Sequence, residues 1–150
     1  MRMTTRFRQL LKEPGIIQSP GAYDCLTANI IQKAGFPSVY MTGAGTSVAQ
    51  LGYPDLALAS MTEMVQNAAS ITETLAVPLI ADADTGYGGV LNVRRTVRQY
   101  ERAGVAAIHI EDQESPKRCG HLDDKKVIST EDMVQKIRAA VDARTDDDFT

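Results

Sequence analysis

Short apolar runs alternate along the chain with longer segments in which apolar residues recur every three or four positions. Short runs of this kind are typical of buried strands, and the longer repeat is typical of amphipathic helices, so the alternation predicts βα units that build a parallel sheet. The four expected strands cover residues 16–18, 38–41, 77–81 and 106–110. The expected helices run from about 23 to 34, from 61 to 75, from the turn at 86–89 to 104, and from about 129 onward.

Local signals fix several helix ends. Ser60 followed by Glu63 has the spacing of a capping box, which predicts the start of the second helix. Gly35 and Gly104 stand where the first and third helices should stop. Residues 42–60 are expected to form a long loop.

The number of units bears on the fold. Residues 146–150 end the chain where a fifth strand should begin. Four βα units cannot close an eight-stranded barrel and leave unpaired strand edges. The long, polar loops follow the strands, as they do in barrel enzymes. We therefore predict an α/β fold that comprises the first four βα units of a (β/α)₈ barrel, with the C-terminal half absent and residues 1–150 forming a single partial domain. An open four-stranded sheet is the structural alternative.

Net charge and hydropathy restrict the classes of partner that the protein is expected to bind. A net charge of −3 argues against a nucleic-acid surface, and the arginines between residues 94 and 102 are interpreted as a solvated helix face. No apolar run approaches the roughly 20 residues of a membrane helix, and the basic start lacks the features of a secretory signal. We expect a cytoplasmic protein without membrane partners. Cys25 and Cys119 lie in unlike contexts, so a disulfide is not expected, and Cys25 is assigned to packing.

Acidic residues gather at the ends of the predicted strands. Asp82 and Asp84 end the third strand, Glu111 follows the fourth, and Asp55 lies in the loop after the second. Adjacent parallel strands bring such residues to one rim, where unpaired carboxylates repel each other unless a cation is bound. Hard oxygen ligands suit Mg²⁺, with Mn²⁺ as an alternative. Turn or helix capping is the competing interpretation for each aspartate.

The loop after the fourth strand carries a cysteine among cations. Lys117, Arg118 and His121 flank Cys119, and such neighbours favour the thiolate form. The thiol could then serve as a proton donor, base or nucleophile, or it could be an incidental cysteine in a basic turn. His109, inside an apolar strand, is interpreted as a core histidine.

The second strand ends in hydroxyls and glycines. The segment from Tyr40 through Thr42, Gly43 and Ala44 offers backbone N–H groups that could hold a carboxylate or phosphate. A plain flexible loop is the alternative, because the spacing is not that of a P-loop.

Six segments taken together resemble the isocitrate lyase and phosphoenolpyruvate mutase superfamily, and most closely its 2-methylisocitrate lyases. They run in order across nearly the whole chain: 21–24, 40–44, 52–55, 82–88, 110–113 and 117–121. The specific ones are D-A-D-T-G-Y-G at 82–88 and K-R-C-G-H at 117–121. The resemblance implies a (β/α)₈ barrel that assembles into homotetramers, with a Mg²⁺ site at its carboxyl-terminal face.

The resemblance also implies roles for individual residues. Asp82 and Asp84 match the metal acids, while Asp55 and Glu111 match acids that hold metal-bound waters. The implied catalytic group is Cys119 with Lys117 and His121. The implied substrate contacts are Tyr40, Thr42, Gly43, Ala44, Asp82, Arg118 and Gly120. The family usually has a serine where Thr42 stands.

The implied reaction is a Mg²⁺-dependent retro-aldol cleavage of 2-methylisocitrate, or of a related 2-hydroxy malate-type acid, to pyruvate and succinate or an analogue. Its partners would be small di- or tricarboxylates or 2-oxo acids. Two alternatives stay open: a phosphoenolpyruvate mutase or oxaloacetate decarboxylase activity on the same scaffold, and an inactive truncated remnant or interaction protein.

Overall fold

The computed structural model describes all residues from Met1 to Thr150, and it contains one parallel sheet with the strand order β1-β2-β3-β4. The strands are β1 (Gly21–Ala22), β2 (Val39–Met41), β3 (Leu79–Asp82) and β4 (Ala107–His109). Their order in space follows their order in the chain, as it does in successive βα units. The predicted α/β class with a four-stranded parallel sheet is therefore confirmed.

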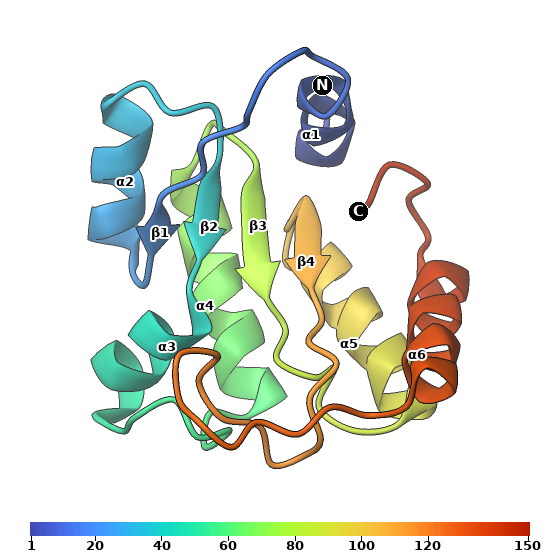
Figure 1. The fold of residues 1–150 in the computed structure, drawn as a ribbon. Helices are drawn as coiled ribbons and strands as arrows, with labels where there is room; N and C mark the ends of the chain where they lie inside the picture. Colours follow the sequence, from blue (N-terminus) through green and yellow to red (C-terminus); the bar gives the residue numbers. More distant parts are fainter.

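Helices connect and cover the strands. They are α1 (Met3–Leu10), α2 (Cys25–Lys33), α3 (Gly43–Thr46), the π-helical turn η1 (Ser47–Leu51), α4 (Met61–Thr74), α5 (Val90–Arg102) and α6 (Thr130–Ala143). Figure 1 shows α4 and α5 behind the sheet, while α1 lies near the amino-terminal ends of the strands. None of the helices has the length and apolar character that crossing a bilayer requires.

The two faces of the sheet carry different cores. The larger cluster packs the helix-covered face, with Met41, Leu79 and Tyr100 fully buried. A smaller cluster on the other face joins Phe7 of α1 to Ile80 of β3. The rest of that second face is open, because no helix covers it beyond α1. An uncovered face leaves side chains of the strands accessible to solvent or to ligands.

Most predicted elements are found close to their predicted positions. Strands β2, β3 and β4 overlap the predicted runs, and Ser60 and Glu63 form a reciprocal capping box at the start of α4. Gly35 and Gly104 follow α2 and α5 with φ values of +90° and +82°. These left-handed conformations end helices and favour glycine. The helix boundaries read from the sequence are confirmed at these points.

The first predicted strand is wrong. Residues 16–18 form no strand, and Ile16 is 92% exposed, whereas Gly21 and Ala22 pair with Tyr40 and Met41 of β2. Register with the neighbouring strand decides this pairing rather than local hydrophobicity. Helix α1 was not predicted from the sequence, and the segment that forms α3 and η1 was predicted to be a loop.

The last residue of the chain adds to the open edge of the sheet. The Thr150 amide donates to the Ala106 carbonyl at 3.2 Å, and the Ile108 amide donates to the Thr150 carbonyl at 2.9 Å. These are the contacts that a further parallel strand would begin with beside β4. They lie where the sequence predicts a fifth strand.

Candidate active site

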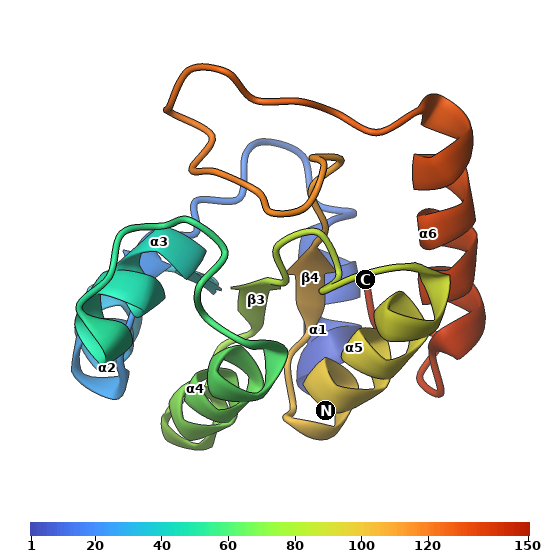
Figure 2. The same ribbon diagram turned by 90° about the horizontal axis from the view of Figure 1, so that it is seen from below.

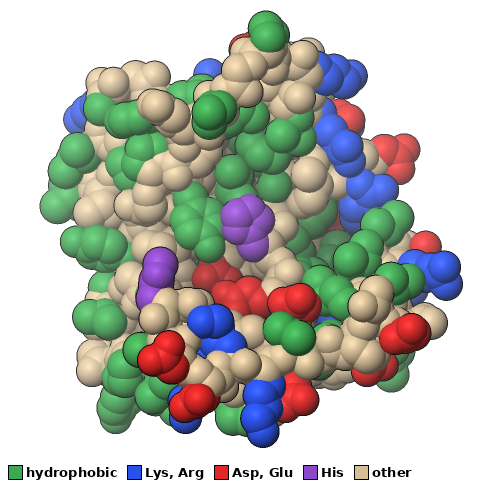
Figure 3. Space-filling model, viewed as in Figure 1, with side chains coloured by type: hydrophobic (Ala, Val, Ile, Leu, Met, Phe, Trp, Pro, Cys, Tyr) green, Lys and Arg blue, Asp and Glu red, His purple; other side chains and the backbone are tan.

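The loops that follow β2, β3 and β4 meet at the carboxyl-terminal ends of the strands. Figure 2 shows this end from below, with the segment after β4 reaching toward α3 before it turns back to α6. In Figure 3 acidic and basic side chains crowd together in the lower part of the open face, beneath a band of hydrophobic ones. The polar groups of several units are thus placed within reach of one another.

Asp82, the last residue of β3, is held from two directions. Its Oδ1 accepts a hydrogen bond from the Asp84 amide at 2.9 Å, and its Oδ2 accepts one from the Gly43 amide at 3.2 Å. A Cβ atom at position 43 would overlap Asp82 Oδ2, so only glycine allows this approach. The hydroxyl of the buried Tyr100 donates to the Asp82 carbonyl at 2.8 Å. The strand end is therefore fixed before any ligand binds.

The turn after Asp82 adopts left-handed backbone conformations at residues that carry side chains. Asp84 has φ +46° and Tyr87 has φ +58°. Such conformations cost about 1 kcal/mol or more and persist where the surroundings enforce them. The Tyr87 hydroxyl lies 3.3 Å from that of Tyr100, which anchors the turn from behind. Because the strand ends at Asp82, strand alternation does not set the direction of Asp84.

A buried lysine lies among the predicted acids. The Lys117 ammonium is 2.7 Å from Asp55 Oδ1, 2.9 Å from Asp84 Oδ1 and 3.9 Å from Glu111 Oε1. Its side chain is 2% exposed. The acids of three βα units do gather at one point, as the sequence predicts, and in this structure the cation at that point belongs to the protein itself.

Burial and charge set the protonation of this group. Burial alone would lower the pKa of Lys117, but its bonds to Asp55 and Asp84 outweigh it and raise the pKa above the ordinary value. Burial raises the pKa of Asp84 to about 6, and Lys117 opposes that rise. Burial, followed by the charge of Asp82, raises the pKa of Tyr40. Lys117 therefore stays charged at neutral pH, and the Tyr40 hydroxyl stays protonated.

The donor set suits a divalent cation that keeps part of its water shell. All four acids offer oxygen ligands, and Mg²⁺ usually takes one or two carboxylates and several waters. No group of three or more His, Cys, Asp or Glu side chains is placed to hold an ion by itself. The site thus fits an ion bound by one or two of these carboxylates, with the remaining acids acting through water.

The segment that carries Cys119 is joined to the loop after β2. The Cys119 amide donates to the Asp55 carbonyl at 3.0 Å. Gln113 is buried, and its side-chain amide donates to Glu111 at 2.6 Å and to the Arg118 carbonyl at 2.8 Å. Sequence reasoning missed Gln113, although it lies within one of the family-like segments. Gln113 links the acid at the end of β4 to the loop that bears the thiol.

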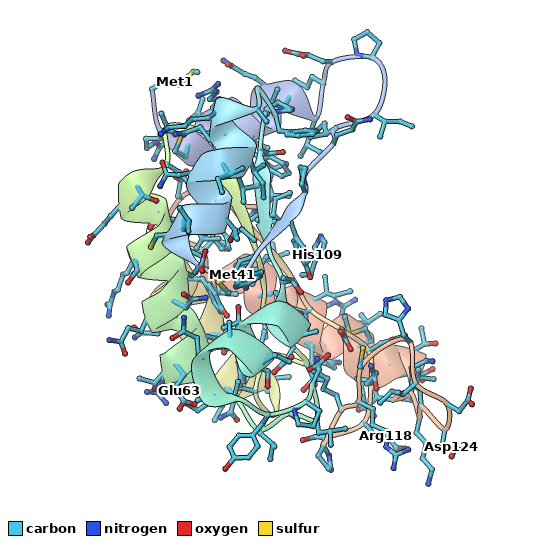
Figure 4. All side chains as sticks on the ribbon, turned by 90° about the vertical axis from the view of Figure 1, so that its left-hand side faces the viewer. Met1, Met41, Glu63, His109, Arg118 and Asp124 are labelled. Atoms are coloured by element: carbon cyan, nitrogen blue, oxygen red, sulfur yellow. The ribbon has the colours of Figure 1, made fainter.

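The basic residues near Cys119 differ in environment. Cys119 is half-buried, whereas Arg118, Gly120 and His121 are exposed. Figure 4 shows Arg118 on the outer loop, where its guanidinium donates to the Asp123 carbonyl. Lys117 binds the acids. The expected influence of Lys117, Arg118 and His121 on the thiol stays a prediction.

The segment after β2 begins the short helix α3. Thr42 caps this helix by accepting the Gly45 amide at 3.3 Å, and Gly43 and Ala44 form its first turn. The Gly43 amide is already donated to Asp82. The expected cradle of free N–H groups is therefore partly used inside the protein, and its role toward a ligand stays a prediction.

Two single-residue interpretations can be compared with the structure. His109 is exposed rather than buried, and its ring lies 5.2 Å from that of Tyr40 on the open face. The core-histidine interpretation was wrong, because β4 is covered on one face only. Cys25 is half-buried and packs against the main core, which agrees with its assigned packing role.

A cavity of about 460 Å³ adjoins the buried lysine on the side of α4 and α5. Asp84 and Lys117 are among its lining residues, together with Asn92 and Arg95 of α5. The residues from Tyr40 to Ala44 do not line it. The cavity thus shares Asp84 and Lys117 with the acid cluster and is not lined by the predicted substrate contacts at residues 40–44.

Comparison with known proteins gives concordant results. The phosphoenolpyruvate phosphomutase family model matches residues 7–150. Over 149 residues the chain is 52% identical to 2,3-dimethylmalate lyase of Eubacterium barkeri, covering 99% of this chain and 52% of that protein. It is 46% identical to 2-methylisocitrate lyase of Shewanella oneidensis, covering 96% of this chain and 49% of that protein. The chain therefore spans about half the length of these curated relatives.

Solved structures agree in fold. A crystal structure of 2,3-dimethylmalate lyase superposes with a TM-score of 0.91 at 48% identity, covering 96% of this chain and 48% of that one. Phosphonopyruvate hydrolase in complex with oxalate and Mg²⁺ gives a TM-score of 0.91 at 35% identity, covering all of this chain and 51% of that one.

Proposed function

We propose a function for this chain from the premise that it belongs to the phosphoenolpyruvate phosphomutase family: it supplies one half of a Mg²⁺-dependent carbon–carbon lyase. The four βα units would form the first half of a (β/α)₈ barrel. The pairing of Thr150 with β4 supports this, because it extends the sheet in the direction that a fifth strand would take. Single-domain organisation, assembly into a homo-oligomer and a cytoplasmic location are parts of the same proposal.

One observation carries the proposal. The loop that carries the Cys119 thiol contacts Asp55 at two points. The Lys117 ammonium binds the Asp55 carboxylate, and the Cys119 amide donates to the Asp55 carbonyl. A cation site and a proton donor at one end of a parallel sheet are what a lyase of this type needs. Because two loops from different units create the arrangement, it is more specific than either motif alone.

The proposed roles follow the geometry. Asp82 and Asp84 would hold the Mg²⁺ ion, with Asp55 and Glu111 acting through its waters. When bound, the ion supplies polarisation of a substrate oxygen. The proposed substrate contacts come from Tyr40, from Thr42, Gly43 and Ala44 at the start of α3, and from Arg118 and Gly120 of the outer loop. Lys117 and His121 would stabilise anionic groups of the substrate.

The proposed reaction breaks the bond between the carbon that bears the hydroxyl and the adjacent CH carbon, which carries a carboxylate. The hydroxyl proton passes to solvent water, the oxygen becomes that of a ketone, and the electron pair of the broken bond passes to the departing carbon. The Cys119 thiol gives a proton to that carbon, which releases a saturated carboxylate. The substrates that the relatives suggest are 2-methylisocitrate and 2,3-dimethylmalate, and both yield pyruvate.

The test is pyruvate release by the intact protein. With Mg²⁺ present we expect turnover of one of these two acids, abolished by EDTA and reduced at least a hundredfold by Cys119→Ser, because general acid catalysis contributes about 10²- to 10⁴-fold. Cys25→Ser is the matched control, since Cys25 lies in α2 and packs against the core. It should leave turnover unchanged.

The alternatives give different outcomes. Turnover of phosphonopyruvate or oxaloacetate that tolerates Cys119→Ser would replace the lyase assignment with a mutase or decarboxylase assignment. Absence of turnover on all four acids by folded, Mg²⁺-supplied protein would favour the inactive remnant and refute the proposed reaction.

A further inference from the structure

Lys117 lies among the carboxylates of the proposed cation site. Four carboxylates, those of Asp55, Asp82, Asp84 and Glu111, lie at the carboxyl-terminal end of the sheet, and Lys117 contacts three of them. We propose that Lys117 is the internal counter-cation of this carboxylate cluster: it keeps the cluster folded in metal-free protein and lowers the affinity of the cluster for divalent cations. The inference rests on the proposed cation site and is independent of the proposed reaction.

Lys117 compensates the charge of two buried carboxylates when no metal is bound. The side chains of Asp55 and Asp84 are only 12% and 9% exposed. Buried carboxylates without a cation are costly, because they lose their hydration and repel one another. Contacts from the Lys117 ammonium at 2.7 and 2.9 Å offset that cost for both. The cluster therefore needs no external ion to keep its shape.

Hydrogen bonds of the neighbouring residues fix the position of the Lys117 backbone. The bonds between the Gln113 side chain and the Arg118 backbone, and the bond from the Cys119 amide to the Asp55 carbonyl, hold the two residues that follow Lys117. The ammonium is thus placed by a folded loop and is not a mobile surface charge. It is present in every molecule at a fixed position, which an ion at limiting concentration is not.

A divalent cation in the acid cluster and the Lys117 ammonium carry like charges and compete for the same carboxylates. A divalent cation bound to Asp84 would lie within a few ångströms of the Lys117 ammonium, because that ammonium is 2.9 Å from Asp84 Oδ1, and two cations at such a separation repel strongly in a partly buried site. The second oxygen of Asp84 receives no hydrogen bond from protein, so an ion can approach it while Lys117 stays in place. Lys117 and the ion then share a ligand, and each weakens the other's binding.

The experiment compares Mg²⁺ binding and thermal unfolding of the intact wild-type protein and the Lys117→Met variant. In EDTA we expect K117M to unfold at a lower temperature than wild type. On addition of Mg²⁺ we expect a larger rise in its unfolding temperature, and an affinity by calorimetry that is tighter on the order of tenfold. Unfolding of K117M in EDTA with recovery in Mg²⁺ would equally support the proposal.

Two control variants separate charge from packing. Lys117→Arg keeps the charge and should behave like wild type in both measurements. Lys136→Met removes a second partly buried lysine, whose ammonium donates to the Thr85 carbonyl at 2.9 Å and contacts no acid. K136M should lose some stability, with the same Mg²⁺ increment as wild type.

Other outcomes overturn the proposal. Weaker binding by K117M, or equal Mg²⁺ increments in K117M and wild type, would refute the counter-cation role and leave the cation site intact. Absence of Mg²⁺ binding by every variant would refute the cation site as well. The wild type supplies a test that needs no variant: its unfolding should stay cooperative in EDTA, and loss of its folded state on chelation would also refute the inference.

Discussion

The two ends of the sheet use the same kind of ion pair with the cation in different environments. At the carboxyl-terminal end, Lys117 pairs with Asp55 while both side chains are nearly inaccessible, at 2% and 12% exposure. At the amino-terminal end, Arg2 pairs with Asp146; the carboxylate is only 13% exposed, but the arginine side chain is 67% exposed. A buried pair cannot lose one member without leaving an uncompensated charge, whereas an exposed charge is returned to water. The difference indicates that polar residues at the first end are fixed in place and those at the second are replaceable.

The largest effect should come from removing one acid at each end. We expect Asp55→Ala to lower the free energy of unfolding in EDTA by about 3 kcal/mol, because Lys117 stays buried with one partner fewer. Asp148→Ala, which removes an acid near Arg2, should cost less than about 1 kcal/mol. Urea unfolding of both variants measures the difference. Equal losses would show that burial does not distinguish the two ends.

A smaller effect should come from the hydroxyl behind the acid cluster. Tyr100→Phe removes the donor to the buried Asp82 carbonyl, and we expect a loss of about 1–2 kcal/mol. Tyr53→Phe is the matched control, since Tyr53 is exposed and its hydroxyl makes no hydrogen bond. Chemical denaturation should leave that control within about 0.5 kcal/mol of wild type. A Tyr100→Phe loss no larger than the control would mean that the strand end does not depend on this bond.

The smallest effect concerns the dependence of the amino-terminal end on pH. Burial opposes it, but the Thr4 hydroxyl, the Asp148 amide and the charges of Arg2 and Arg144 together lower the pKa of Asp146 below its ordinary value. A carboxyl whose pKa is lower in the folded state stabilises the fold above the unfolded pKa of about 4, and this stability is lost as pH falls further.

Asp146→Asn should therefore lower stability by on the order of 0.5 kcal/mol at pH 7 and have less effect near pH 3. Thermal unfolding across pH 3–7 measures this. Asp142→Asn is the control for removal of a carboxylate, because Asp142 is exposed on α6. An Asp146 effect that is constant with pH would contradict the argument.

The gathering of acids at the carboxyl-terminal end of the sheet could be predicted from the sequence, although irregular loops carry some of these acids. Parallel strands share a direction, so acids that follow β2, β3 and β4 must meet at one edge once the strands are located. Apolar runs located those three strands. The two-residue strand β1 has no such run, because its pairing with β2 fixes it.

The presence of Lys117 within the acid cluster could not be predicted from the sequence. Lys117 is 62 residues from Asp55 in the chain, and local sequence shows its charge without showing its partner. From the sequence, the charge of Lys117 was predicted to act on the neighbouring Cys119 thiol, whereas in the structure its ammonium contacts Asp55 and Asp84. Similarly, His109 follows an apolar pattern, but its exposure depends on whether a layer covers that face of the sheet.

The contact between Gly43 and Asp82 limits how this site can diverge among related proteins. Any side chain at position 43 would meet the carboxylate that ends the next strand, so that position is closed to variation while the aspartate remains. The flanking positions Thr42 and Ala44 carry no such restriction. Changes in substrate preference during evolution should therefore accumulate on either side of the glycine, and an engineered library is best directed there.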